Sequence, residues 1–130
     1  MKSKELFDLA VRASGSSYSP YSHFHVGAAL VAGSGKVYTG CNIENASYSM
    51  TICAERTAIF KAISEGETEI KAIAVAGSAG DDYSVPCTPC GACLQVMAEF
   101  AADDMAVILS DGEHSLSDFL PVRFSDKNLT

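Results

Sequence analysis

The chain has 130 residues, of which 48% are hydrophobic and 19% charged, and its formal net charge at pH 7 is -7. This length and composition predict one folded domain over residues 1–130, with enough apolar side chains to form a core without disulfides. An acidic surface repels phosphate backbones, so a nucleic-acid polymer is excluded as the expected partner, whereas a small uncharged ligand remains compatible.

The cysteine content points to metal binding in a reducing compartment. There are five cysteines, an odd number, and the first residues contain no apolar signal region. No apolar run approaches the ~20 residues that cross a bilayer. We therefore expect a soluble, cytoplasmic protein without membrane association, in which clustered thiols bind a metal ion and do not cross-link.

Hydrophobic periodicity and turn residues predict strands interleaved with helices. In chain order the sequence predicts a helix over 3–13, a turn-rich loop over 15–22, a hairpin of strands 25–31 and 36–43, a helix from about 53 to 65, a strand over 70–76, a loop over 78–89, a helix from about 90 to 102, a strand over 105–109, a weak strand near 115, a short helix over 117–120 and a tail to 130. Ser3 is the expected N-cap of the first helix. The pattern favours a mixed sheet between helical layers.

Two cysteine clusters stand where predicted helices begin. The first is Cys53-Ala54-Glu55-Arg56, and the second is the segment PCTPCGAC, residues 86–93. Cys-x-Glu followed by Pro-Cys-x-x-Cys is typical of a zinc site that activates water beside a carboxylate. Helix N-termini carry partial positive charge and favour thiolates, so both clusters lie in a suitable local environment.

The number of thiolates decides whether such a site is catalytic. A catalytic zinc has three protein ligands and an open position for water, whereas four ligands close a structural site. We favour Cys53, Cys90 and Cys93, because Pro89 suits a helix start and leaves Cys87 in the preceding loop. The spacing Cys87-x-x-Cys90 is equally good, so a non-catalytic four-cysteine zinc module remains the alternative.

Glu55 and Arg56, which follow Cys53 closely, suggest proton transfer and charge compensation. Glu55 is placed to take a proton from activated water and to hand it to a leaving group. Three thiolates on one dication leave a net charge of roughly −1. Arg56 lies three residues after Cys53 on the same helical face, from which it can donate hydrogen bonds to the sulfurs.

Over nearly its whole length the chain resembles the small, homotetrameric, zinc-dependent cytidine deaminases. The resemblance rests on the segments YSPYSHFHVGAA (18–29), GCNIENASY (40–48), CAERTA (53–58) and PCGAC (89–93). It implies a three-layer α/β/α sandwich with a five-stranded mixed sheet. It also implies one Zn²⁺ per subunit on Cys53, Cys90 and Cys93, with Glu55 as the proton shuttle.

The resemblance further implies contacts to a nucleoside. Asn42 and Glu44 would bind the ribose hydroxyls, and Phe24 would pack against the pyrimidine. The backbone of Ala54 would meet the base carbonyl, and the carbonyl of Thr88 would accept a hydrogen bond from the exocyclic amine.

Two aromatic residues are expected at contacts between subunits. Phe124 lies in LPVRF (120–124), which is similar to a C-terminal motif whose phenylalanine enters a neighbouring subunit's pocket, and Tyr48 is expected at a subunit contact. One position departs from the family, because Leu94 stands where arginine is common. Arg56 is then the one cation that the sequence places near the thiolates.

The activity implied is hydrolytic deamination of cytidine and deoxycytidine to uridine and deoxyuridine with release of ammonia, a step of pyrimidine salvage. A first alternative is a deaminase for a modified cytosine nucleoside such as a nucleoside antibiotic, although Asn42 with Glu44 favours plain ribose or deoxyribose. A polynucleotide deaminase is disfavoured by the charge and by the lack of basic, aromatic strand-binding stretches. The four-cysteine module accounts for the cysteines but not for Glu55 and Arg56.

Overall fold

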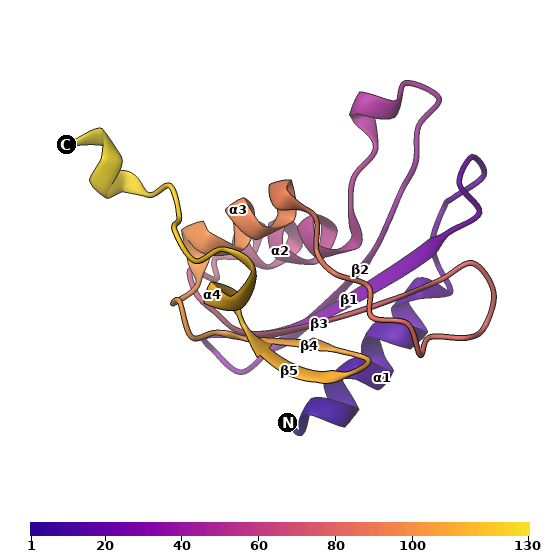
Figure 1. Ribbon diagram of the computed structural model, residues 1–130, viewed down its shortest axis with the longest axis horizontal. Coiled ribbons are helices and arrows are strands. Elements are labelled where there is room, and N and C mark those ends of the chain that lie inside the picture. The colour runs from indigo at the N-terminus through magenta and orange to yellow at the C-terminus, as the bar shows by residue number, and fades with distance from the viewer.

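A five-stranded mixed sheet lies between helices on both of its faces (Figure 1). The computed structural model describes residues 1–130. Its elements are α1 Ser3–Ser14, β1 His25–Ala32, β2 Val37–Cys41, the 3-10 helix η1 Tyr48–Met50, α2 Ala54–Ser64, β3 Ile70–Ser78, α3 Gly91–Phe100, β4 Ala106–Leu109, β5 Gly112–Ser115, α4 Leu116–Phe119 and the 3-10 helix η2 Asp126–Leu129. The predicted α/β/α sandwich with a five-stranded mixed sheet is confirmed.

The strand order places two helix starts at one edge of the sheet. The order is β2-β1-β3-β4-β5, in which β1 is antiparallel to both β2 and β3, and β3 is parallel to β4. Strands β2, β3 and β4 therefore run in the same direction. The connections β2–α2–β3 and β3–α3–β4 each leave the carboxyl end of a strand, so α2 and α3 both begin beyond this edge, where ligands commonly bind in α/β folds.

The sheet buries apolar side chains on two sides, as its nearly continuous apolar strands predict. On one face α1 packs through Leu6 and Ala10 against small residues of β1 and β3. On the other face α2 and α3 cover a larger core that includes Ile59, Met97 and Val107. Apolar burial in this larger core holds α2 and α3, the two helices that carry the cysteine clusters.

Two glycines allow helices to approach the sheet closely. A Cβ atom added to Gly27 would lie 1.9 Å from the carbonyl oxygen of Ala10 in α1. A Cβ atom added to Gly40, on β2, would lie 2.7 Å from the carbonyl oxygen of Ala54 in α2. Both contacts are to main-chain atoms, which cannot rotate away, so the absence of a side chain sets the distance between helix and sheet.

Three local features differ from the sequence prediction. Lys2, not Ser3, is the N-cap of α1, because the first helical hydrogen bond runs from the Leu6 N–H to the Lys2 carbonyl. Strand β2 ends at Cys41, since the chain then turns away to form a projection in which Ile43 pairs with Ile52. Residues 48–50 and 126–129 form the 3-10 helices η1 and η2, neither of which was predicted.

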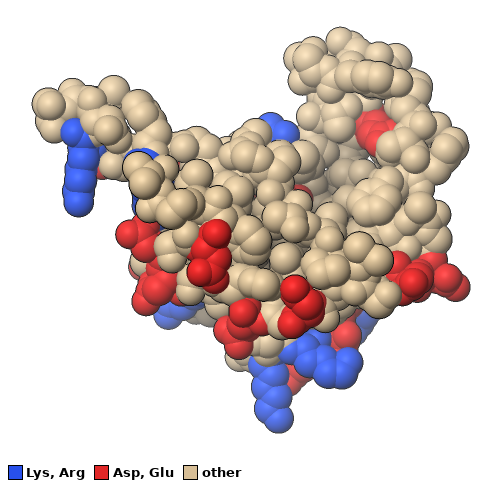
Figure 2. Space-filling view, in the orientation of Figure 1, with Lys and Arg blue, Asp and Glu red and all other residues tan.

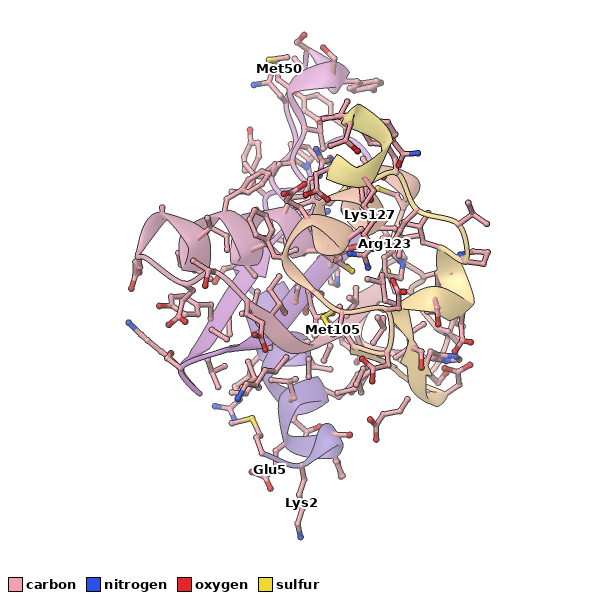
Figure 3. All side chains as sticks on the ribbon, turned by 90° about the vertical axis from the view of Figure 1, so that its left-hand side faces the viewer. Lys2, Glu5, Met50, Met105, Arg123 and Lys127 are labelled. Carbon is pink, nitrogen blue, oxygen red and sulfur yellow. The ribbon has the colours of Figure 1, made fainter.

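Two segments project from the body of the molecule. We call residues 43–52 the arm and residues 121–130 the tail (Figure 1). Both expose large apolar side chains: Tyr48 is 72% exposed, Met50 65% and Phe124 58%. Met50 marks the tip of the arm in Figure 3, at the end of the molecule opposite Lys2.

Most charged side chains of the visible face lie on the body of the molecule (Figure 2). In Figure 2 they lie mainly over the lower half of the visible face, and the rim between arm and tail is mostly uncharged. None of the helices combines the length and apolarity that a membrane crossing requires.

Replacing Gly27 with alanine should test the close helix–sheet contact. The added methyl group overlaps main-chain atoms of α1, so Gly27→Ala should lower the free energy of unfolding by about 1–3 kcal/mol, measured by urea denaturation. Gly80→Ala is the matched control, because a Cβ atom there meets nothing within 4 Å. Equal stability of the two variants would contradict the prediction.

Candidate active site

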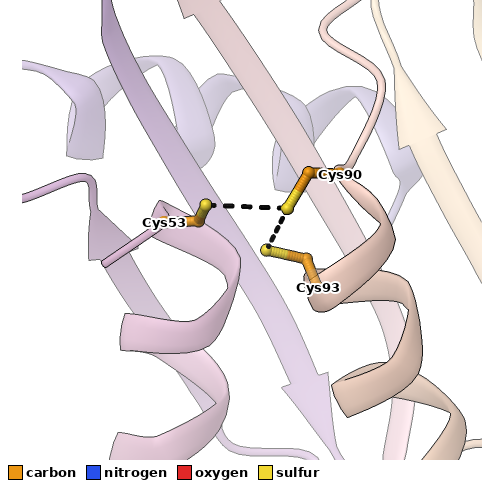
Figure 4. Close-up of side chains that lie close together, drawn as sticks. All are labelled: Cys53, Cys90 and Cys93. Atoms are coloured by element: carbon orange, nitrogen blue, oxygen red, sulfur yellow. Dashed lines mark hydrogen bonds between the residues drawn. The ribbon is translucent and has the colours of Figure 1, made fainter. Parts of the chain in front are cut away.

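Three cysteine sulfurs meet at the starts of α2 and α3 (Figure 4). Cys53 is the N-cap of α2, Cys90 is the N-cap of α3, and Cys93 lies in the first turn of α3. The Sγ atoms of Cys53 and Cys90 are 3.8 Å apart, those of Cys90 and Cys93 are 3.5 Å apart, and all three lie within 4.8 Å of one another. Sulfurs on a tetrahedral zinc with Zn–S bonds of ~2.3 Å lie about 3.8 Å apart, so this spacing fits zinc.

The helix starts leave these sulfurs available for a metal ion. The backbones of Cys53 and Cys90 are extended, and neither side chain forms a capping hydrogen bond with its own helix. The unpaired N–H groups of each first turn give the region partial positive charge, which stabilises thiolates. The two helices thus contribute both ligands and a favourable local potential.

Cys87 lies outside the three-sulfur set. Its side chain packs against the core beneath α2 and α3, and a Cβ atom added to Gly77 would lie 2.8 Å from the Cys87 Sγ. Burial raises the pKa of the Cys87 thiol to about 11, which favours the neutral form. Three cysteines are therefore gathered, not four, which contradicts the closed four-thiolate arrangement.

The guanidinium of Arg56 compensates charge at the thiols. Its Nη2 donates a hydrogen bond to the Cys53 Sγ over 3.4 Å, and its buried Nε has no partner. Hydrogen bonds from Cys93 and from Arg56 lower the pKa of the Cys53 thiol to about 5, while the pKa of Cys93 is raised by the shared hydrogen bond. A half-buried cation with a free donor suits three thiolates around a dication, which would carry excess negative charge.

Glu55 is a buried carboxyl group beside this cluster. Its side chain belongs to the first turn of α2, is 4% exposed and lines the same cavity as Cys53 and Cys90. Burial raises the pKa of Glu55 to about 7. Because both protonation states are then accessible near neutral pH, Glu55 is suited to accept and to donate a proton.

The cavity in front of the cysteines has a volume of about 170 Å³. It contains three of the residues predicted to contact a nucleoside, namely Asn42, Ala54 and Thr88. A second cavity of about 360 Å³ is lined by Tyr21, Ser22, Glu44, Tyr48 and Thr51. Thr51 lines both cavities, so they adjoin. Together they reach the ~300–1,000 Å³ that small-molecule sites commonly have, which the first cavity alone does not.

The serine-rich loop over 15–22 holds the side chains of Asn42 and Glu44. Asn42 Oδ1 accepts hydrogen bonds from the Val26 N–H over 2.9 Å and from the Ser17 hydroxyl, and Asn42 Nδ2 donates to the Phe24 carbonyl over 2.9 Å. The hydroxyl and N–H of Ser22 donate to the Glu44 carboxylate and lower the pKa of Glu44.

Ser17 and Ser22 were missed by the sequence analysis, which treated 15–22 only as a turn. The available signal was the run of serines in the turn-rich loop over 15–22, because small hydroxyl side chains can donate hydrogen bonds to carboxylate and amide oxygens such as those of Asn42 and Glu44.

Three other predicted site residues do not line the cavity in front of the cysteines. The Phe24 ring lies against Gly77, where an added Cβ atom would be 2.9 Å from Phe24 Cε2, and the ring lines neither cavity. Tyr48 packs edge-to-face on Tyr21, with ring centroids 5.9 Å apart. Phe124 also lines neither cavity of its own chain.

The position of Leu94 leaves the thiols with a single basic neighbour. Leu94 is 7% exposed and packs into the apolar core, so this position offers no cation.

The largest cavity, about 760 Å³, lies at the opposite edge of the sheet, near Ile70 and Ala106, and contains no cysteine.

Single-cysteine variants should separate ligands from bystanders. Cys53→Ser should lose bound zinc, because it removes one of three gathered sulfurs, whereas Cys87→Ser should keep about one zinc per chain. Atomic absorption on purified protein measures both values. As a control, X-ray absorption should count three sulfur ligands on zinc in both the parent protein and Cys87→Ser. Loss of zinc in Cys87→Ser would contradict the assignment.

The amino-acid sequence and the fold both match known deaminases. The family described as "Cytidine and deoxycytidylate deaminase zinc-binding region" matches residues 1–109. A cytidine deaminase of Sporosarcina psychrophila is 46% identical over 135 residues, covering 100% of this chain and 96% of the relative.

Solved structures give the same result. The crystal structure of a cytidine deaminase from Burkholderia pseudomallei has a TM-score of 0.85 and 44% identity, covering 95% of this chain and 100% of its own. The crystal structure of a cytidine deaminase from Mycobacterium tuberculosis has a TM-score of 0.87 and 35% identity, covering 96% of this chain and 98% of its own. Similarity of this extent, together with the gathered cysteines and the buried Glu55, shows that the chain belongs to the cytidine and deoxycytidylate deaminase zinc-binding family.

Proposed function

We propose that this protein is a zinc-dependent hydrolytic deaminase that converts cytidine and deoxycytidine to uridine and deoxyuridine with release of ammonia, a cytoplasmic step of pyrimidine salvage. The observation that carries the proposal is the buried Glu55, which shares a small cavity with two of three gathered cysteines. Relatives at 46% identity over the full chain are named cytidine deaminases.

Cys53, Cys90 and Cys93 would hold the zinc ion. When bound, zinc polarises water and lowers its pKa, which supplies a nucleophile at neutral pH. The Glu55 carboxylate accepts the proton that water gives up as its oxygen attacks C4 of the cytosine ring, and delivers this proton to N3. Glu55 then takes the proton of the C4 hydroxyl and passes it to the amino group, which leaves as ammonia. The pKa of about 7 suits a group that must act in both directions.

The two adjoining cavities suggest how a nucleoside lies. The pyrimidine occupies the cavity in front of the cysteines, where the first N–H of α2, at Ala54, has no partner within the helix and meets the base carbonyl. The Thr88 carbonyl accepts a hydrogen bond from the exocyclic amine. The sugar lies at the boundary between the cavities, within reach of Asn42 on one side and Glu44 on the other.

Assembly into a homotetramer would cover the projecting apolar segments. In this arrangement Phe124 of one subunit enters the site of a neighbour, Phe24 packs on the pyrimidine beside it, and Tyr48 lies at a subunit contact. The exposure of Tyr48, Met50 and Phe124, and the absence of Phe124 from its own cavity, support the proposal. Monomers seldom expose large contiguous apolar patches without a partner.

Multi-angle light scattering tests the assembly. The expected mass is about four times 13.7 kDa at micromolar protein concentration. A monomer of 13.7 kDa with full specific activity would overturn both the tetramer and the role of Phe124 in a neighbouring site.

Loss of cytidine absorbance, measured together with ammonia release, tests the activity. The purified protein should convert cytidine and deoxycytidine, and a chelator should abolish turnover. Glu55→Gln should retain zinc and bind cytidine, because the amide keeps the shape of the side chain, but should lower kcat by at least about 10²-fold, because it cannot accept the proton. Glu99→Gln, at an exposed carboxylate on α3, is the control. Near-normal turnover by Glu55→Gln would contradict the role of Glu55.

A further inference from the structure

The side chain of Arg123 is bound to the C-terminal end of α3. Its Nη2 donates hydrogen bonds to the carbonyl oxygens of Ala98 and, over 3.1 Å, Ala101, and its Nη1 contacts the Asp103 carboxylate over 2.7 Å. The last carbonyl groups of a helix lack partners within it, and a cation there interacts favourably with the helix dipole. Arg123 therefore fastens the beginning of the tail to the helix end, at the point marked in Figure 3.

A second contact fixes the next residue of the tail. Gln95, on α3, donates a hydrogen bond from Nε2 to the main-chain carbonyl of Phe124 over 3.0 Å. The Phe124 side chain is nevertheless 58% exposed, and that of Val122 is 89% exposed. The main chain at 123–124 is thus held along α3 while the apolar side chains of Val122 and Phe124 remain exposed. This combination is expected of a segment that presents a side chain to a partner.

We propose that Arg123 and Gln95 are positioning residues that hold Phe124 in the orientation in which it enters the active site of a neighbouring subunit. The inference rests on the proposed function, in which Phe124 completes a neighbour's nucleoside site. A tail fixed at two points loses less conformational freedom when its side chain is buried at the subunit contact, so the completed site forms at lower entropic cost.

One helix then serves two sites. Cys90 and Cys93 lie at the N-terminal end of α3, in the chain's own site, whereas Arg123 binds its C-terminal end. A helix of ten residues is about 15 Å long and rigid on this scale. The main chain at Phe124 is therefore held at a defined position relative to the thiol cluster of its own chain.

A role in capping alone has different consequences. If Arg123 only satisfied the carbonyl groups of α3, its removal would lower stability and leave the substrate affinity of the folded enzyme unchanged. Gln95 offers an independent test, because its contact involves the tail carbonyl and no helix carbonyl. Gln95→Met removes the donor and keeps the length of the side chain.

The experiment compares steady-state kinetics with cytidine for the zinc-loaded parent and its variants. The single variants are Arg123→Ala, Gln95→Met and Phe124→Ala. Two double variants combine Phe124→Ala with Arg123→Ala or with Gln95→Met. Loss of an aromatic contact to a base should raise KM on the order of tenfold in Phe124→Ala, with kcat little changed. Arg123→Ala and Gln95→Met should each raise KM about threefold to tenfold. On the Phe124→Ala background neither should raise it further, because both act through Phe124.

Matched controls keep the outcome specific. Arg12→Ala removes an exposed arginine of α1, on the opposite face of the sheet, and should leave KM unchanged. Arg123→Lys keeps the charge next to Asp103 but lacks the planar fork that reaches two carbonyl groups, so its KM should lie between those of the parent and Arg123→Ala. Zinc content and light-scattering mass should equal those of the parent in every variant.

The results distinguish failure of this inference from failure of the proposed function. Unchanged KM in both Arg123→Ala and Gln95→Met, with raised KM in Phe124→Ala, would overturn the positioning role and leave the function intact. Additive effects on the Phe124→Ala background, or a raised KM that appears only with loss of oligomer mass, would overturn it equally. A parent protein that does not deaminate cytidine would overturn the proposed function itself.

Discussion

The convergence of two helix N-termini beyond one edge of the sheet is the constraint on which the site depends. It places Cys53 and Cys90 at N-cap positions 3.8 Å apart, and it aims the partial positive charge of both helices at the same thiols. The same geometry buries Glu55 in the first turn of α2 and leaves the Ala54 N–H free. The connections β2–α2–β3 and β3–α3–β4 bring both helix starts to this edge. The close contact between Gly40 and α2 holds α2 against the sheet.

Electrostatic balance at the site depends on few groups. Leu94 is buried in the core, so Arg56 is the one basic side chain in contact with the sulfurs. Its Nη2 reaches Cys53, and its Nε remains without a partner in a buried position. A cation so close to the ligands moderates the electron donation of three thiolates to a metal ion, which otherwise weakens the metal as a Lewis acid. Substitution of Arg56 therefore affects metal chemistry and local packing together.

Local patterns predicted the elements, but contacts between distant segments could not be inferred from them. Periodicity gave the helices and strands to within a few residues, and cysteine spacing with the family resemblance gave Cys53, Cys90 and Cys93. Spacing alone could not exclude Cys87, because its exclusion depends on its position beside Gly77 of β3. The hydrogen bonds from Ser17 and Ser22, and those of Arg123 with the end of α3, likewise join segments whose proximity only the folded chain defines.

The separation of the metal ligands along the chain also has a consequence for folding. Cys53 and Cys90 are 37 residues apart, and β3 must be inserted between β1 and β4 before their sulfurs can meet. The unfolded polypeptide offers only the local cysteines near residue 90, which form an incomplete chelate. Zinc thus binds the native state far better than the unfolded state, and by mass action each tenfold rise in free zinc above the dissociation constant adds about 1.4 kcal/mol to native stability. Zinc supply therefore affects the equilibrium stability of the folded chain as well as its chemistry.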